Sequence, residues 1–354
     1  MKHRIEALQE VLKGRDLPGL LITKQENVRY ISGFTGSSGA CLITGEHAYF
    51  VTDFRYTEQA ADQIKGMEIV QIDRSIPVTI GELIAGARVR AVGVEKDSLT
   101  LALFELYDQA TAIELVPTSG IVENLRLIKD SSEIKMVKEA VGIADAAFHH
   151  ILTYIRPGVT ELDVSNELEF FMRKQGATSS SFDIIVASGH RSALPHGVAS
   201  AKVIESGELV TLDFGALLNG YVSDITRTVA VGEISDELHK IYDTVLRAQL
   251  AGVEGLRPGI TGIEADALTR DIIKDAGYGE YFGHSTGHGI GLEVHEGPGL
   301  SFRSETKLEP GMIVTVEPGI YVPKIGGCRI EDDVLITENG REILSQSPKE
   351  LITL

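Results

Sequence analysis

The sequence predicts an α+β protein in which a small N-terminal α/β domain is followed by a larger domain built from two α-α-β-β repeats. A chain of 354 residues is long for one hydrophobic core, which favours two domains. Short apolar runs alternate with helical patterns in the first third of the chain, as expected for an α/β domain. In the remaining two thirds, matched motifs recur 101 to 107 residues apart, and this spacing indicates an internal duplication.

The first third contains short apolar runs that we interpret as strands, separated in several places by helix-like segments. The predicted strands cover residues 19–23, 40–44, 49–52, 69–72, 91–94 and 113–116. The helix-like segments cover residues 54–63, 79–85 and 101–110. This order predicts an N-terminal α/β domain over residues 1–125, and we find no catalytic constellation of side chains in it.

The second domain is expected over residues 126–354, after a boundary near residues 124–130. The pentapeptide Arg-Pro-Gly-Val-Thr at 156–160 returns as Arg-Pro-Gly-Ile-Thr at 257–261, each time between two helical patterns. The run ending in Asp213 returns as the run ending in Glu317, each in a β-rich context. Matched motifs in the same order favour a duplicated α-α-β-β unit over coincidence.

The charge balance argues against nucleic acid as a partner. The chain has 33 basic and 51 acidic side chains, a net charge of −18. Such a surface repels phosphate backbones. Part of this excess would be structural if some of the carboxylates form a metal site.

The cysteine count and the apolar patterning predict a soluble cytoplasmic protein. Only Cys41 and Cys328 are present, too few for a disulfide framework in a chain of this length, so we expect reduced thiols. The N-terminal residues lack the apolar core of a signal peptide. No run approaches the ~20 apolar residues that span a bilayer.

Two acids flank a predicted hairpin turn that contains Asn219-Gly220. If the hairpin is centred between Leu218 and Asn219, Asp213 lies directly opposite Asp224 on the same face of the sheet. Two like charges at that separation destabilise the fold unless a cation lies between them. The alternative is that one of the acids points outward into solvent.

A second acidic pair and a histidine-rich segment favour the metal site over that alternative. Glu317 and Glu331 form the second pair, and residues 284–296 contain three histidines between glycines. A zinc site made only of histidines is disfavoured, because His288 and His295 are too far apart for one helical turn. One histidine with four carboxylates could hold two metal ions, and this oxygen-rich set suits Mn²⁺, Co²⁺ or Fe²⁺ as well as Zn²⁺.

Five segments of the second domain resemble the metal-binding motifs of the M24 metallopeptidases, whose fold is called pita-bread. These segments are Leu-Asp213-Phe-Gly, Ser-Asp224-Ile-Thr-Arg, Gly-His288-Gly-Ile-Gly, Val-Glu317-Pro-Gly and Arg-Ile-Glu331-Asp. The resemblance implies that Asp213 and Asp224 hold one metal ion and that His288 helps to hold the other. It also implies that Asp224 and Glu331 are shared, with Glu317 beside the nucleophilic water as the general base. Mn²⁺ is the first expectation for both ions.

Further residues resemble the M24B branch, which contains aminopeptidase P and prolidase and has a creatinase-like N-terminal domain. They are His196, His284, His295, Tyr321 and Arg329. The resemblance implies that His284 or His295 donates to the developing oxyanion and that His196 closes the pocket around proline. Tyr321 and Arg329 would orient the substrate or the acids. The alternatives are ordinary core packing for Tyr321 and a simple salt bridge for Arg329.

The resemblance implies a homodimeric exopeptidase for peptides with proline in second position. Gly299 stands where some dipeptidase relatives carry arginine, and a glycine there favours an aminopeptidase over a strict Xaa-Pro dipeptidase. The dipeptidase stays as the alternative. A non-catalytic pita-bread binding module or a metal-free amidinohydrolase is disfavoured, because the chain keeps all five ligand positions.

Overall fold

The computed structural model describes residues 2–354, and the chain divides into two compact units. The first unit extends to Arg126 and the second covers Leu127–Leu354. Each unit has its own sheets and its own buried core, and each is described by itself.

The first unit is built on one six-stranded mixed sheet with the strand order β4-β3-β2-β1-β5-β6. Strands β1, β2 and β3 pair antiparallel, whereas β4, β5 and β6 each join the sheet in parallel. The strands are β1 (Gly19–Ile22), β2 (Ala40–Thr44), β3 (Ala48–Thr52), β4 (Glu68–Gln71), β5 (Ala91–Glu95) and β6 (Glu114–Thr118). All the predicted strands are therefore present, with ends that agree to within two residues.

The helices of this unit were only partly predicted. Predicted segments correspond to η1 (Phe54–Tyr56) with α3 (Thr57–Gln63), to α4 (Ile76–Ala87) and to α5 (Leu101–Ala110). The sequence analysis did not assign α1 (Lys2–Gly14), α2 (Gln25–Ser32) or α6 (Ile121–Arg126). Helix α1 buries Ile5, Leu8 and Leu12, a spacing of three and four residues that marks an amphipathic helix.

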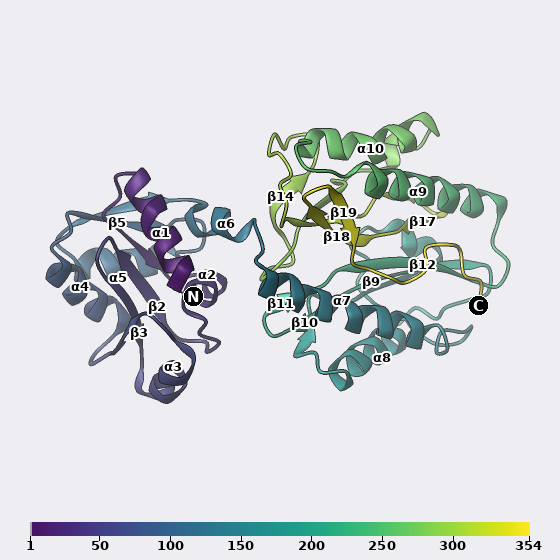
Figure 1. Cartoon of the computed structure of the whole chain (residues 1–354). Helices are drawn as coiled ribbons and strands as arrows, with labels where there is room; N and C mark the ends of the chain where they lie inside the picture. The colour runs from purple at the N-terminus through teal and green to yellow at the C-terminus, as the bar shows by residue number, and fades with distance from the viewer. Residues whose placement is uncertain (1) are drawn as a thin grey trace. The chain divides into compact units, whose positions relative to one another are not determined.

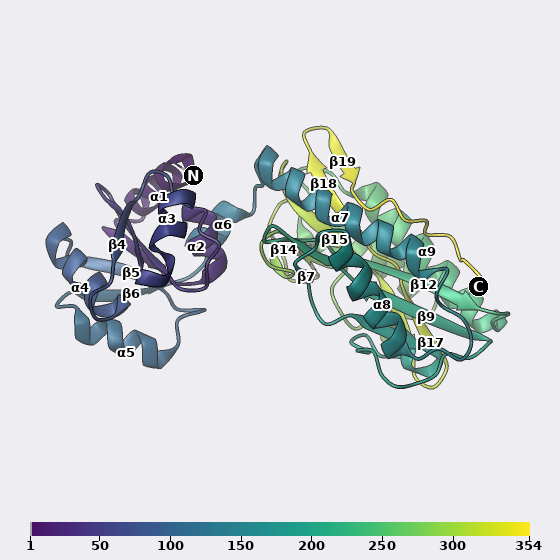
Figure 2. The same ribbon diagram turned by 90° about the horizontal axis from the view of Figure 1, so that it is seen from below.

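The second unit places two helix pairs on opposite sides of a set of strands, as Figures 1 and 2 show. Its helices are α7 (Ser131–Ile151), α8 (Glu161–Lys174), α9 (Asp236–Gly255) and α10 (Gly262–Asp275), with η2 (Gly189–Ala193) and η3 (Gly279–Tyr281). The strands of the first half are β7 (Ser179–Ser180), β8 (Ile185–Ser188), β9 (Glu208–Phe214), β10 (Ala216–Leu218), β11 (Tyr221–Val222) and β12 (Ile225–Val231). The strands of the second half are β13 (Gly287–Gly289), β14 (Glu296–Leu300), β15 (Ile313–Val316), β16 (Gly319–Val322), β17 (Gly326–Arg329), β18 (Asp332–Thr337) and β19 (Gly340–Ile343). No helix within residues 2–354 combines the length and apolar character needed to cross a membrane.

The repeated pentapeptide has the same structural role in both halves, which supports the predicted duplication. Its glycines, Gly158 and Gly259, adopt φ of 97° and 90°, a region that favours glycine. The next threonines, Thr160 and Thr261, form capping boxes that begin α8 and α10. The backbone N–H of each glycine donates to a following loop, at 3.0 Å in the first half and 2.8 Å in the second.

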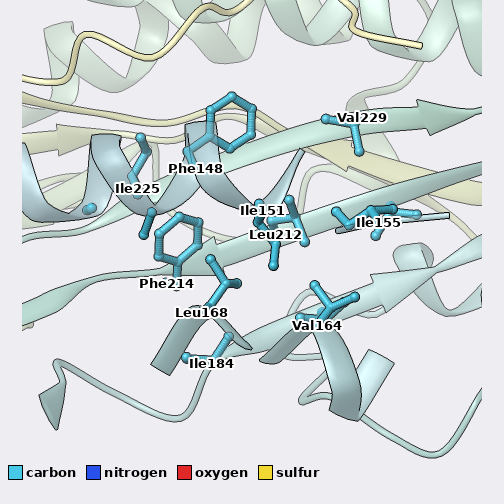
Figure 3. Close-up of a cluster of buried hydrophobic side chains, with 14 of the residues drawn as sticks. Phe148, Ile151, Ile155, Val164, Leu168, Ile184, Leu212, Phe214, Ile225 and Val229 are labelled. Carbon is cyan, nitrogen blue, oxygen red and sulfur yellow. The ribbon is translucent and has the colours of Figure 1, made fainter. Parts of the chain in front are cut away.

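The core of the first half lies between the α7–α8 pair and the strands β9 and β12. Figure 3 shows Phe148 and Ile151 of α7, together with Leu168 of α8, directed toward Leu212 and Phe214 of β9. These side chains are at most 1% exposed. Burial of this apolar surface fixes β9, which contains Asp213, and β12, which begins directly after Asp224.

The predicted register of the β9–β12 hairpin was wrong by two residues. Asp213 pairs with Thr226 rather than with Asp224. The turn is centred between Asn219 and Gly220, both of which have positive φ, as a two-residue type I′ turn requires. Because side chains alternate with a period of two, the shift leaves Asp213 and Asp224 on the same face.

Arg227, in β12, joins the two halves on the side of the strands away from the acids. It is 1% exposed, and its Nη2 donates to Asp332 Oδ1 at 2.8 Å and to the Ser347 carbonyl at 2.8 Å. Asp332 also pairs with Lys349 of the C-terminal segment. The network links both halves to the C-terminal segment. Loss of one of its members would leave a buried charge without a partner, which is strongly destabilising.

Candidate metal centre

The five predicted ligands lie at the ends of strands that meet in the middle of the second unit. Asp213 is in β9, and Asp224 directly precedes β12. His288 is the central residue of β13, Glu317 directly follows β15, and Glu331 directly precedes β18. All five line one cavity of about 580 Å³.

The side chains approach closely enough to share a cation. Ligand atoms of Asp224, His288 and Glu331 all lie within 4.8 Å of one another. The Nε2 atom of His288 is 3.3 Å from Glu317 Oε1 and 3.8 Å from Asp224 Oδ2. At these separations, small shifts of the side chains would allow all of them to coordinate one metal ion.

Glycines allow His288 to reach this position. A Cβ atom on Gly287 would stand 2.0 Å from the carbonyl oxygen of Thr315, and one on Gly289 would stand 1.9 Å from that of Gly297. Only glycine permits the backbones to approach so closely. The glycines around His288 therefore serve the packing of β13 between β14 and β15.

Burial of several acids together perturbs their titration. Burial and the nearby Glu331 and Asp213 raise the pKa of Asp224 well above its usual value. Burial and the neighbouring Glu317 likewise raise the pKa of Glu331. Burial would also raise the pKa of Glu317, but the hydrogen bond and charge of His288 outweigh it, and that pKa is lowered.

The chemistry of the donors fits a divalent metal. Three of the four carboxylate ligands have a buried oxygen without a hydrogen-bond partner among residues 2–354, namely Asp213 Oδ1, Asp224 Oδ1 and Glu331 Oε1. A buried carboxylate oxygen without a partner costs free energy, and a cation would remove that cost. Four carboxylates with one imidazole form a set suited to hard or borderline divalent ions.

Arg329 and Tyr321 belong to a hydrogen-bonded chain that ends at the acids. Arg329 ion-pairs with Asp213, and its Nη1 donates to the Tyr321 hydroxyl at 2.7 Å. That hydroxyl lies 2.8 Å from His284 Nε2. Burial lowers the pKa of His284, which favours a neutral ring at physiological pH. Arg329 thus forms an ion pair with one of the acids, and it also lines the cavity.

The other two predicted histidines also line the cavity. The rings of His295 and His288 lie 4.2 Å apart between centroids. Burial lowers the pKa of His295, and the nearby His288 lowers it further. His196 reaches the cavity from the loop after η2 and is exposed.

The rest of the cavity is largely apolar, which suits a small hydrophobic substrate group. The apolar side chains that line it are Phe182, Ile185, Pro195, Val198 and Val294. Gly299 and Asp183 line it as well, and Asp183 is exposed.

Sequence analysis missed residues that support the ligands. Thr226 Oγ1 donates to Glu331 Oε2 at 2.6 Å, and the Asp224 backbone N–H donates to Asp333 Oδ2 at 3.0 Å. Thr315 Oγ1 accepts from the His288 N–H at 3.1 Å. Thr315 and Asp333 are cross-strand neighbours, so the register of β15 and β18 places both. The signal available was their position two residues from a ligand, on the same face of a strand.

Cys328 does not take part in the centre. It is fully buried beside the core of the second half, and burial raises the pKa of its thiol to about 12. A thiol in this state is a poor metal ligand and a poor nucleophile, so packing accounts for it. Cys41 is also a free, buried thiol.

A duplicated α+β domain that gathers four carboxylates and an imidazole at its centre defines a protein built to hold divalent cations. The model of metallopeptidase family M24 matches residues 135–338, and that of the creatinase/prolidase N-terminal domain matches residues 4–128. The chain belongs to metallopeptidase family M24 and has the pita-bread fold. Membership implies divalent metal ions and peptide-bond hydrolysis.

Relatives with solved structures or curated names cover the whole chain. The chain is 61% identical to an Xaa-Pro dipeptidase from Bacillus anthracis, with 99% of both chains covered and a TM-score of 0.98. It is 42% identical to a curated Xaa-Pro dipeptidase from Pyrococcus horikoshii, with 99% of both covered. It is also 39% identical to an X-Pro aminopeptidase from Thermotoga maritima, with 99% of both covered and a TM-score of 0.90.

Proposed function

We propose that this protein is an Xaa-Pro dipeptidase, a prolidase, that uses two divalent metal ions. The observation that carries the proposal is the set of buried carboxylate oxygens without hydrogen-bond partners among residues 2–354, in a cavity that also presents His196, His284 and His295. The catalytic machinery belongs to residues 126–354.

The choice of a dipeptidase revises the expectation drawn from Gly299. A glycine at that position favoured an aminopeptidase. The relatives named dipeptidase include those of higher identity, and the aminopeptidase named above is less similar. These names support the dipeptidase, which was the alternative in the sequence analysis. An Xaa-Pro aminopeptidase is the second candidate, because that relative has the same fold over the same length.

The metal-binding roles follow from the positions of the acids. Asp213 and Asp224 would hold one ion, His288 would help to hold the second, and Asp224 and Glu331 would be shared. When bound, two such ions polarise the scissile carbonyl and lower the pKa of a water molecule. Mn²⁺ is the ion we expect first, with Co²⁺, Zn²⁺ or Fe²⁺ as alternatives.

Glu317 is the proposed general base. It faces the cavity, where its carboxylate could accept a proton from the attacking water. The same carboxyl group would return that proton to the leaving proline nitrogen. Without this transfer the departing amine would leave as a poor anionic group.

The remaining cavity residues would bind and orient the substrate. His295 would donate a hydrogen bond to the oxygen on which negative charge develops. His284 is less suited to this role than the sequence suggested, because its two ring nitrogens already have partners in the Ser285 carbonyl and the Tyr321 hydroxyl. His196 would close the apolar part of the cavity around the proline ring. Tyr321 would fix the His284 ring through its hydrogen bond, and Arg329 would fix the Asp213 carboxylate through its ion pair.

A comparison of peptide lengths tests the specificity. We expect rapid hydrolysis of Gly-Pro and Leu-Pro by the Mn²⁺-loaded protein and little or none of the tripeptide Arg-Pro-Pro. Cleavage of Arg-Pro-Pro at a rate similar to that of the dipeptides would favour the aminopeptidase. Cleavage of neither, with metal shown to be bound, would point to a binding module.

Metal analysis tests the metal requirement separately. Purified protein should contain divalent metal, lose turnover after chelation and regain it when Mn²⁺ is added. Undiminished turnover in a metal-free sample would favour the amidinohydrolase type of chemistry. A homodimer and a cytoplasmic location are expectations of the same proposal, which gel filtration and cell fractionation would test.

A further inference from the structure

The loop that carries His196 is held by residues outside the cavity. Among residues 2–354, the His196 ring has no hydrogen-bond or ion-pair partner, and the side chain is exposed. Its position in the cavity therefore depends on the backbone of residues 189–200. Within this loop, Pro195 and Val198 also line the cavity.

Glu161, the first residue of α8, holds both ends of this loop. Its side chain is 0% exposed. Oε1 accepts from the Ser188 backbone N–H at 2.8 Å and from the Ser188 hydroxyl at 2.9 Å. Oε2 accepts from the Ser200 backbone N–H at 3.1 Å and from the Ser200 hydroxyl at 2.6 Å. One carboxylate thus holds together Ser188, which precedes the loop, and Ser200, its last residue.

Arg191 connects the same carboxylate to the interior of the loop. Its Nε atom lies 3.0 Å from Glu161 Oε2, and its Nη2 donates to the Val198 carbonyl at 2.7 Å. A charged hydrogen bond to a fully buried acid is strong and directional. We call Glu161 and Arg191 together the loop clamp.

The second half of the unit contains a similar device for His284. Asp266 of α10 is 1% exposed and ion-pairs with Arg270, whose Nη2 donates to the His284 carbonyl at 2.7 Å. The two histidines nevertheless differ. The His284 ring is also fixed by the Tyr321 hydroxyl, whereas the His196 ring has no such bond within the described chain.

We infer that Glu161 is a positioning residue for His196 and that the loop clamp sets how well the cavity closes around the substrate. Glu161 does not line the cavity, so it acts only through the loop. This inference rests on the proposed function, because it assigns His196 to substrate binding. It predicts that His196 is more sensitive to loss of its anchor than His284 is.

The primary test is Glu161→Gln in the metal-loaded protein, assayed with Leu-Pro. Glutamine keeps the shape of the Glu161 side chain. It cannot form an ion pair with Arg191, and only one of its two terminal atoms can accept hydrogen bonds. A displacement of His196 by about 1 Å should lower kcat/KM by about 10- to 100-fold, with bound metal unchanged. The matched control is Asp163→Asn, also in the first turn of α8, where the Asp163 carboxylate accepts from the Thr160 N–H and hydroxyl. The control should stay within about twofold of the parent.

A double-mutant cycle with His196→Ala separates positioning from general damage. If Glu161 acts through His196, Glu161→Gln should lower kcat/KM less than about threefold once His196 is already alanine. A further loss as large as in the parent background would overturn the inference. Absence of Xaa-Pro hydrolysis by the parent protein would instead refute the proposed function.

Hydrogen exchange gives a readout that does not depend on catalysis. In Glu161→Gln, the amides of residues 189–200 should lose protection, while those of residues 282–286 keep it. Equal loss in both segments would indicate general destabilisation and contradict a local role. If Glu161→Gln does not fold, Arg191→Gln provides the same test, because it releases the Val198 carbonyl and leaves the buried serine contacts of Glu161 intact. Arg191→Gln with full activity and full protection of residues 189–200 would overturn the inference.

Discussion

The two halves of the second unit share a fold but divide the chemistry unequally. Each begins with a helix pair joined through the same capped pentapeptide. The first half contributes Asp213, Asp224 and a single histidine to the cavity. The second half contributes three ligands, the other two histidines and the Tyr321–Arg329 pair. Duplication therefore preserved the scaffold, while the proposed acid–base and oxyanion groups collected in the second copy.

The strand registers explain part of this difference. In the first half Asp213 lies opposite Thr226. In the second half Val316 pairs with Asp332 and Gly319 pairs with Arg329, a register that sets Glu317 opposite Glu331. The second half thus places an acid opposite an acid, whereas in the first half Asp213 lies opposite a threonine.

The largest expected effect comes from removing the proposed base in the second half. Glu317→Gln should lower kcat/KM by about 10²- to 10⁴-fold, because an amide cannot accept the proton from water. Steady-state assays with Leu-Pro, beside metal analysis of the same sample, measure it. Near-normal turnover would show that Glu317 is not the general base. The second half would then contribute less of the chemistry than we propose.

The next effect concerns the first half, where an acid has a structural partner as well. Asp213→Asn leaves Arg329 without its ion-pair partner, and Arg329 is only 3% exposed. Loss of one member of a buried ion pair should lower the free energy of unfolding by about 3 kcal/mol and weaken metal binding. Urea unfolding of the metal-free protein would measure the change in the free energy of unfolding, and metal titration would measure the change in metal affinity. Asp183→Asn, an exposed cavity acid, is the matched control and should leave the stability of the fold unchanged.

A smaller effect should appear when pH is varied in the absence of metal. The folded pKa values of Asp224 and Glu331 are raised, so the folded state binds more protons than the unfolded chain above their ordinary values of 3.8 and 4.5. Stability of the chelated protein should therefore fall as pH rises from about 4.5 toward those raised values. Thermal unfolding from pH 4.5 to 8 should show a decline of several degrees with chelator and a much weaker one with Mn²⁺. A flat profile in chelator would mean that the acids are not held together without metal.

The smallest expected effect concerns the capping boxes, which both halves have kept. Thr160→Ala and Thr261→Ala each remove one capping box and should each cost about 1 kcal/mol of stability. Denaturation of the two variants should give equal values within error. Unequal values would show that the halves have diverged in their scaffold as well as in their chemistry.

Much of the fold and the set of residues around the cavity could be predicted from the sequence, because both leave local patterns. Alternating apolar runs marked the strands of the first unit, and repeated motifs marked the duplication. The hairpin register could not be placed correctly, because it depends on which residues accept positive φ. Assigning that role to Asn219-Gly220 would have given the observed pairing.

Other features depend on contacts that no sequence spacing reveals. The salt bridge between Arg329 and Asp213 joins residues 116 positions apart. Glu161 resembles any acid in the first turn of a helix, and only the folded loop shows what it holds. The preference for an aminopeptidase rested on the single position Gly299, whereas the relatives reflect the whole chain.

The crossed contacts between the halves have an evolutionary consequence. Arg329 of the later copy holds Asp213 of the earlier one, and Thr226 of the earlier copy holds Glu331 of the later one. A substitution at one of these positions leaves a buried group of the other copy without its partner, so each copy constrains the sequence of its twin. Across diverging lineages, these partners should therefore be inherited and replaced as pairs.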